Sequence, residues 1–339
     1  MGRLALRHGL YIDWRFCISL CNTQLPCAAD PGRLSQTHAA NRVPLPTINT
    51  LNELHNGALR AAKQVKLACG LTKFPRALLE LADTLEVLDL SGNALSSLPD
   101  NLMRLTRLRI LFCSDNQFTA LPEVLGRCAQ LSMAGFKANQ IHTVSAKALP
   151  PLLRWLILTD NRITRLPAEL GDCAQLQKLM LSGNQLKALP PELSRCSGLE
   201  LLRIAANQLT ELPAWLLAMP RLSWLAYAGN PLCTAQENTA RVAATLTSIA
   251  WLHLRMQHLL GEGASGAIYR AEYLQGEQVR QVAVKIFKGD ITSDGLPQAE
   301  MTACMAAGRH PGLVPVLGDD AASEGCQGPG DAADPLPLS

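Results

Sequence analysis

Large apolar residues recur along the middle of the chain at a fixed interval, and an asparagine marks each repeat of the pattern. Around each asparagine the text approximates LxxLxLxxNxLxxLPxxLxxLxx, best kept from Leu85 to Pro99 and from Leu176 to Pro190. The LxxLxL run alternates apolar and variable positions, which predicts one short strand per repeat with inward-pointing leucines. A single repeat cannot bury that apolar face, so stacked neighbours must bury it together. The asparagines stand at intervals of 22 or 23 residues, at Asn93, Asn116, Asn139, Asn161, Asn184, Asn207 and Asn230.

This period and this text resemble the leucine-rich-repeat family over about residues 47–233. The resemblance implies an α/β solenoid with one parallel strand per repeat. A degenerate earlier unit, from Gln64 to Thr84, has Gly70 in place of the asparagine. The third repeat is one residue short and has Val144 and Ser145 where Leu-Pro is expected, which predicts a local irregularity.

Several polar or reactive side chains of the repeats are expected to be structural. A buried asparagine amide needs hydrogen-bond partners, and the turn backbone of its own and adjacent coils can supply them. Cys128, Cys173 and Cys196 each fall twelve residues after a repeat asparagine, where sister repeats carry Leu105 and Met219. We therefore expect these thiols to act as small buried apolar groups. The sequence shows no CxxC pair and no metal-ligand spacing of histidines, so no metal site is predicted.

Both ends of the array need a cap over the open core. Thr50 and Glu53 have the spacing of a capping box and are followed by Leu54 and Leu59 at helical intervals. The same spacing recurs in the segment 234–237, just after the last repeat. We therefore expect a short helix at each end.

The strand positions between the inward leucines are expected to face the concave side of the solenoid, and we call this surface the strand face. One of its two columns is apolar at six of seven positions and includes two tryptophans. Exposed apolar patches of this kind usually mark a protein partner site. The alternative is that these side chains cover one another or pack against another part of the chain. The candidate partner-binding residues are Val87, Ile110, Phe112, Met133, Trp155, Ile157, Leu201 and Trp224.

The sequence after the array lacks the repeat pattern and contains a GxGxxG element. The element begins after Leu260 with Gly261, Gly263 and Gly266. Dinucleotide folds also use this pattern, but they need a helix after the glycines and an acid about 20 residues on. Here the residues after the glycines favour a strand instead of a helix. Lys285 stands 19 residues after Gly266, at the end of the run Val-Ala-Val-Lys.

This combination resembles the glycine-rich loop and third strand of protein kinases, as in bacterial cytosolic leucine-rich-repeat kinases. The resemblance implies that the three glycines approach the phosphates of ATP, with Leu260 at the start of the loop. It implies further that Ile268 and Ala283 sandwich the adenine, and that Lys285 holds the phosphates while pairing with Glu300. The family reaction is phosphorylation of protein Ser/Thr hydroxyls.

The departures from the kinase pattern decide what this chain can do. Catalysis needs an HRD catalytic loop and a DFG metal-binding motif, and neither follows Lys285. We therefore predict no catalytic residue and no metal ligand, ATP binding that is weak or absent, and a role for Mg²⁺ only in a full-length homologue. Two explanations stay open for this incomplete kinase-like segment. The gene is a frame-shifted or truncated copy, or the segment is retained as an interaction surface.

These signals divide the chain into five segments. They are an unstructured leader (1–46), the array with its N-terminal cap helix (47–233), a C-cap helix and linker (234–248), a kinase small-lobe fragment (249–318) and a disordered acidic tail (319–339). The alternative for the leader is that it comes from a misplaced start codon. The expected fold class is an α/β leucine-rich-repeat solenoid followed by an incomplete protein-kinase-like N-lobe, an antiparallel sheet plus one helix.

Composition narrows the choice of partners and location. The formal net charge is +3, and all of it comes from the leader, so no basic face for nucleic acid is expected. No uncharged apolar run reaches about 18 residues, so no membrane partner is expected. Asp13 and Arg15 interrupt the apolar run of the leader, which argues against a secretion signal and favours a cytoplasmic location. The sequence does not fix the oligomeric state.

Overall fold

The computed structural model describes residues 9–13, 48–235, 247–262, 266–287, 295–297, 300 and 316–320. The chain divides into two compact units. One comprises Leu25–Asn238 with Ile291–Glu300, and the other comprises Met1–Gln24, Thr239–Asp290 and Met301–Ser339. We call them the array unit and the second unit.

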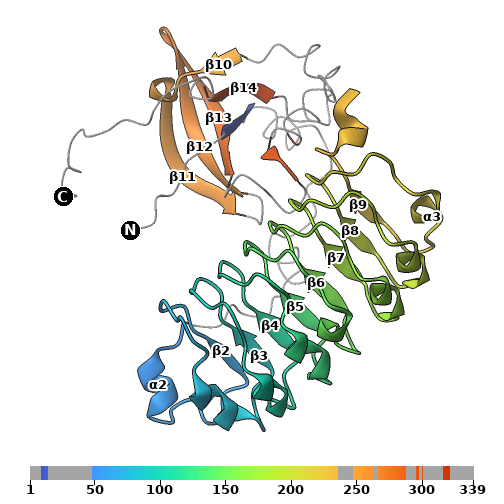
Figure 1. Cartoon of the computed structure of the whole chain (residues 1–339). Coiled ribbons are helices and arrows are strands. Elements are labelled where there is room, and N and C mark those ends of the chain that lie inside the picture. The colour runs from blue at the N-terminus through green and yellow to red at the C-terminus, as the bar shows by residue number, and fades with distance from the viewer. Residues whose placement is uncertain are drawn as a thin grey trace, which may run out of the picture. The chain divides into compact units, whose positions relative to one another are not determined.

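The array unit is built on one parallel sheet of eight short strands, each supplied by one repeat (Figure 1). Neighbouring strands pair in register, so that Leu88 lies beside Leu111 and Leu156 beside Leu179. The predicted strand per repeat is therefore confirmed, including one in the degenerate unit. The strands are β2 (Gln64–Lys66), β3 (Val87–Asp89), β4 (Ile110–Phe112), β5 (Met133–Gly135), β6 (Trp155–Ile157), β7 (Lys178–Met180), β8 (Leu201–Arg203) and β9 (Trp224–Ala226).

A short helical turn closes each repeat on the side away from the strands. Most of these turns begin after the proline of the LP pair, whose fixed φ suits the residue before a helical turn. They are η2 (Arg76–Leu81), η3 (Asp100–Arg104), η4 (Glu123–Arg127), η5 (Ala146–Ala148), η6 (Ala168–Asp172), η7 (Pro191–Arg195), α3 (Ala214–Leu217) and η8 (Pro231–Cys233). The turn η5 has three residues where η4 and η6 have five, so the predicted irregularity of the third repeat is present.

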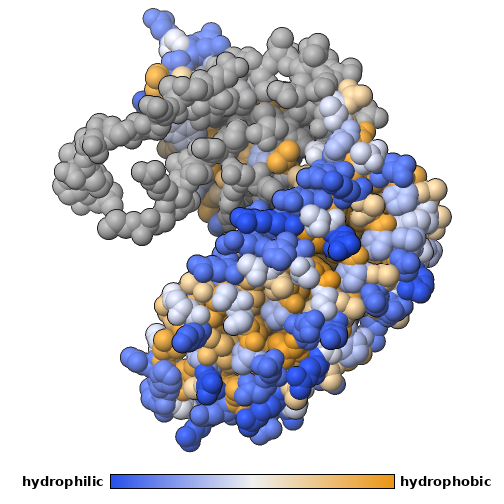
Figure 2. Space-filling model, in the orientation of Figure 1, coloured by the Kyte–Doolittle hydropathy of each residue, from blue (hydrophilic) through white to orange (hydrophobic). Residues whose placement is uncertain are grey.

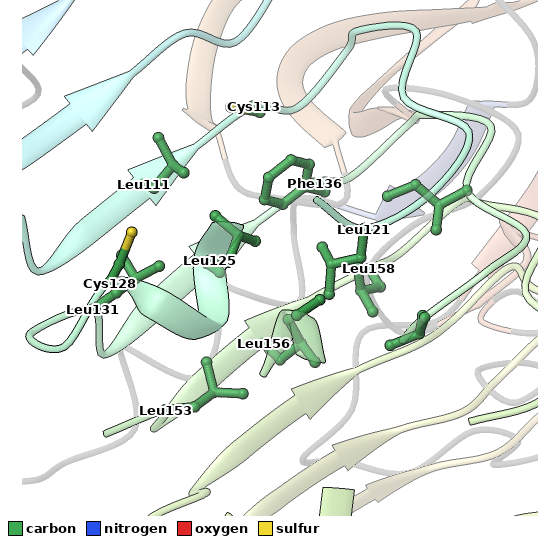
Figure 3. Packing of buried hydrophobic residues seen from close by; sticks show 14 of the residues in the cluster. Leu111, Cys113, Leu121, Leu125, Cys128, Leu131, Phe136, Leu153, Leu156 and Leu158 are labelled. Carbon is green, nitrogen blue, oxygen red and sulfur yellow. The ribbon is translucent and has the colours of Figure 1, made fainter. Parts of the chain in front are cut away.

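One continuous apolar core lies between the strands and the turns. The central strand leucines form its spine, and Figure 3 shows Leu111 and Leu156 pointing into it with Leu125 and Leu131. The predicted column is confirmed, because each of its members is at most 1% exposed: Leu88, Leu111, Leu156, Leu179 and Leu202. Cys128, which lies among these side chains in Figure 3, is 3% exposed and acts as the small apolar group expected of it.

The repeat asparagines bridge adjacent repeats. Asn207 accepts a hydrogen bond from the backbone N–H of Leu186 at 3.0 Å, and its amide donates to the carbonyls of Leu181 and Ile204. The same arrangement recurs from Asn93 to Asn230. The predicted structural role of these side chains is confirmed.

The N-terminal cap also follows the prediction. Helix α2 (Leu51–His55) begins with a complete capping box, in which Thr50 accepts from the N–H of Glu53 and the Glu53 carboxylate accepts from the N–H of Thr50. Leu54 is buried under this helix. At the other end, the predicted box reaches residue 237, which lies outside the described residues.

The second unit contains a six-stranded sheet in the order β10-β14-β1-β13-β12-β11. One half of it is an antiparallel meander of β11 (Leu254–Glu262), β12 (Gly266–Gln275) and β13 (Gln278–Phe287), with β11 at the edge of the sheet. The other strands are β1 (Gly9–Asp13), β10 (Thr247–Ile249) and β14 (Val316–Asp320), and a short turn, η9 (Trp251–His253), precedes β11. The meander agrees with the antiparallel sheet expected after the array, while the kinase-like N-lobe stays a prediction.

The second unit departs from the predicted segment boundaries at two places. The leader is not unstructured throughout, because its residues Gly9–Asp13 form β1 between β13 and β14. Strand β14 continues to Asp320, two residues into the predicted disordered tail. In both cases the strand is fixed by pairing with residues far away in the sequence, which a local pattern does not reveal.

Candidate functional site

The strand face of the array consists of the first and third side chains of each strand, which point away from the core. Its apolar residues are partly exposed rather than buried, as the sequence predicted for Trp155 and Trp224. Trp224 is 52% exposed. Figure 2 shows apolar patches between hydrophilic residues on the side of the array that it displays. The candidate residues of intermediate exposure are Val87, Ile110, Phe112, Met133, Trp155, Ile157 and Leu201.

The register of the sheet brings these residues into rows. Val87 pairs with Ile110, Ile110 with Met133, and Met133 with Trp155. Leu201 lies beside Trp224 at the far end. Because adjacent parallel strands lie about 4.8 Å apart, the side chains of one column touch along the sheet. The structure therefore places the candidate partner-binding residues on a single surface.

Two cations of the strand face lie over the two tryptophans. The Nζ of Lys178 is 3.9 Å from the centre of the Trp155 ring, on the next strand. The guanidinium carbon of Arg203 is 5.8 Å from the centre of the Trp224 ring. Such contacts stabilise by about 0.5–1 kcal/mol at exposed sites. Lys178 is not among the candidate residues predicted from the sequence, although its position one repeat after Trp155 is a usable signal.

Part of the strand face covers itself, as the alternative interpretation proposed. A Cβ added to Gly135 would come within 2.6 Å of the Phe112 ring, which therefore lies over this glycine. At the N-terminal end, Lys66 and Asp89 form an ion pair at 3.3 Å. This internal packing is local, because Trp155, Leu201 and Trp224 keep exposed surface.

The second unit brings several candidate nucleotide-binding residues into one line across the meander. Gly261 on β11 lies opposite Ile268 on β12, which lies opposite Lys285 on β13. Opposed residues share a face of an antiparallel sheet. Ala283 shares that face because it stands two residues before Lys285. The opposite face carries a small core that includes Ala271, Val282 and Val284. Leu260 lies on β11 at intermediate exposure.

The two described glycines of the loop differ in their surroundings. A Cβ at Gly266 would collide with the backbone carbonyl of Ile286, so this glycine permits the close approach of β12 and β13. A Cβ at Gly261 would meet no heavy atom within 4 Å. Gly261 is therefore the one of these two that packing does not require. Gly263 lies outside the described residues.

Lys285 is buried, with 8% of its surface exposed, and its Nζ lies 4.7 Å from the centre of the Phe287 ring. Glu300 is helical, and its N–H donates to the Leu296 carbonyl at 3.4 Å. The two residues are grouped with different units. The predicted ion pair between them stays a prediction.

The array also contains a pocket, but on the side of the helical turns. It has a volume of about 230 Å³ and lies beside the short third repeat, lined by Leu149, Pro150, Glu169, Asp172 and neighbours. This is below the roughly 300–1,000 Å³ of typical ligand pockets. Among the described residues, no group of three His, Cys, Asp or Glu side chains is placed to hold a metal ion. Within the same residues, no helix is long and apolar enough to cross a bilayer.

The comparisons with known proteins concern the array. A family model described as leucine rich repeat matches residues 151–209 and 174–232, and a second with the same description matches residues 84–105. No curated protein matches the chain.

Several solved structures are similar in part. One is a leucine-rich-repeat protein of Leptospira interrogans, 20% identical over 56% of this chain and 71% of that chain, with a TM-score of 0.38. Another is the plant peptide hormone receptor RGFR1 in complex with RGF2, 23% identical over 52% of this chain and 30% of that chain, with a TM-score of 0.45. A third is the Toll–Spatzle complex of Drosophila, 25% identical over 51% of this chain and 24% of that chain, with a TM-score of 0.46.

The repeat period, the buried asparagines and the matched repeat models agree with one another. They identify the array as a set of leucine-rich repeats.

Proposed function

We propose that the chain is a non-catalytic scaffold that binds a protein partner on the strand face of its array. The observation that carries the proposal is the partly exposed apolar column from Val87 to Trp224. Soluble proteins rarely expose a contiguous apolar surface without a use for it. Aromatic residues in such a surface commonly dominate binding energy.

The arrangement of Trp155 suits it to be an anchor for the partner. Lys178 lies over its ring at 3.9 Å and favours one ring orientation, which lowers the side-chain entropy lost on binding. Its neighbours in the column, Met133 and Lys178, offer an adaptable apolar side chain and a positive charge. We expect the partner to present an apolar segment with a carboxylate near Lys178.

The test compares Trp155→Ala with Leu217→Ala, a matched control on α3 whose side chain is 75% exposed. A partner is first recovered with the parent chain, and its affinity for all three proteins is then measured by calorimetry. Trp155→Ala should weaken binding by roughly 30-fold or more, equivalent to about 2 kcal/mol. Leu217→Ala should leave the affinity unchanged. Equal affinity of the parent and Trp155→Ala would contradict the proposal, provided that circular dichroism shows both folded.

A second candidate function concerns the second unit, which we propose to be a kinase-like small lobe that contacts ATP weakly and transfers no phosphate. The alignment of Gly261, Ile268 and Lys285 across three strands supports this candidate. In the family, the glycines approach the phosphates and the lysine holds them. The chain contains neither HRD nor DFG, so it lacks the residues that would act as the base and bind magnesium.

Calorimetry with ATP, with and without Mg²⁺, tests this second candidate alongside a phosphotransfer assay on a generic protein substrate. We expect weak binding without magnesium dependence, because the magnesium ligands that stabilise phosphate charge are missing. Lys285→Met should remove the residual binding, and Lys187→Met, an exposed lysine of the array, should not. Tight magnesium-dependent binding, or transfer that Lys285→Met abolishes, would show that catalytic residues are present elsewhere.

A further inference from the structure

The sheet of the second unit is assembled from both ends of the chain. Strands β11, β12 and β13 follow one another, and Gly276, with φ of +60°, lies in the tight turn between β12 and β13. The next strand in the sheet is not the next in sequence. It is β1, from the leader, seen in dark blue beside β13 and β14 in Figure 1.

Strand β1 is paired along both of its edges. It runs antiparallel to β13 through five residue pairs, from Gly9 opposite Ile286 to Asp13 opposite Val282. On its other edge it runs antiparallel to β14, with an irregularity between Leu10 and Ile12. A strand in this position takes up the backbone donors and acceptors of two neighbours at once.

The edge of β13 that faces β1 could not be left open without cost. The side chains of Val282, Val284 and Phe287 are at most 3% exposed, so this part of β13 is withdrawn from water. A buried backbone group without a partner costs about 1–3 kcal/mol, and an open apolar edge invites pairing with other chains. The strand that pairs with this edge is β1, which is distant from β13 in sequence.

We infer that the gap between β13 and β14 is a strand-acceptor site and that the chain's own residues Gly9–Asp13 occupy it. The segment suits this role, because it contains no proline and its Leu-Tyr-Ile centre has high strand propensity. The array is therefore inserted in sequence between two parts of one folded unit. Residues Gly9–Asp13 are a structural element of that unit, held by the backbone pairing that domains with an open sheet edge use to bind extended peptides.

Amide hydrogen exchange of the full chain, read by NMR, tests the inference. Every β13 amide from Val282 to Ile286 should be protected in the parent chain, since alternate amides point to β12 and to β1. Ile12→Pro removes a backbone donor from a strand paired on both edges. In this variant alternate β13 amides should exchange at least tenfold faster, while those that face β12 stay protected. Ser19→Pro, in the leader but outside β1, should behave as the parent.

Two further measurements keep the result decisive if Ile12→Pro disturbs the whole unit. In the parent chain, backbone nuclear Overhauser contacts should join the region of Tyr11 to that of Val284, which lie opposite each other. A peptide of residues 1–24, added to the Ile12→Pro chain, should restore the lost protection, and the same peptide carrying Ile12→Pro should not. Absence of the Overhauser contacts, or fast exchange of alternate β13 amides already in the parent, would overturn the inference.

Discussion

At the scale of single residues, the asparagine of each repeat stabilises the array because one small side chain makes several buried hydrogen bonds. At the turn after each strand, its amide forms hydrogen bonds with backbone groups that have no backbone partner there. Because its oxygen accepts from the preceding repeat, each side chain also fixes two coils to each other. Asn207 is 7% exposed, so water cannot take over these hydrogen bonds.

Replacing Asn207 by alanine should therefore lower the free energy of unfolding by about 1–3 kcal/mol. The change leaves the N–H of Leu186 without its partner, at about 1–3 kcal/mol for a buried group left unpaired. The carbonyls of Leu181 and Ile204 each keep a hydrogen bond from another repeat asparagine, so they add less. Urea denaturation followed by circular dichroism measures the loss. Asn101→Ala, at an exposed asparagine of η3, should change stability by less than about 0.5 kcal/mol. Similar losses for the two variants would argue against the role of the bridging amide.

The buried thiols make stability depend on alkaline pH. Burial raises the pKa of Cys128 to about 11, and it does the same for Cys173 and Cys196. The unfolded chain loses these protons near the ordinary thiol pKa of about 8.5, whereas the folded chain keeps them. Stability from this source is therefore complete below that pH and is lost as pH rises towards about 11.

Cys128→Leu should flatten this pH dependence. Leucine stands at the equivalent position of another repeat, Leu105, so the side chain suits the core there. The difference in unfolding free energy between pH 8 and pH 10.5 should be smaller in the variant than in the parent. Chemical denaturation at the two pH values measures it. A pH dependence as steep as that of the parent would show that the Cys128 thiol does not titrate as burial requires.

At the scale of the elements, each strand contributes one side chain to the core and two to the strand face. Three residues are too few for a strand to be stable alone, so each depends on its neighbours in the sheet. The central leucine makes the largest contribution because it lies on the spine of the core. Leu179 is fully buried there.

Leu179→Ala should cost about 2–5 kcal/mol, the range for truncating a buried leucine where the surroundings cannot collapse. The shift of a thermal or urea unfolding curve measures this loss of stability. Leu217→Ala serves as the control, since Leu217 is 75% exposed and little apolar burial is lost there. A melting curve of Leu179→Ala that superposes on that of the parent would contradict the burial of the column.

At the scale of the whole molecule, the parts that sequence could predict are those whose cause is local. The residues that determine the strand, the turn and the asparagine lie within each repeat, so the array could be predicted from the repeated sequence pattern. The capping box at Thr50 and Glu53 is equally local. Strand β1 could not be found in this way, because its partner Val284 lies far along the chain.

The candidate sites show the same division. Strand alternation placed Trp155 and Trp224 on an exposed face, and the structure agrees. The close packing that requires Gly266 depends on the backbone of β13, so it could not be predicted from the loop motif. The contact of Lys178 with Trp155 follows from the register of two repeats and was predictable in principle.

Oxidative footprinting of the complex with a recovered partner tests the central claim most directly. Met133, Trp155, Met180 and Trp224, all with side chains on the strand face, should be oxidised in the free chain and protected in the complex. Met103 and Trp251, which are 38% and 42% exposed elsewhere, should be oxidised equally in both. Protection of Met103 with continued oxidation of Trp155 and Trp224 would contradict binding through the strand face.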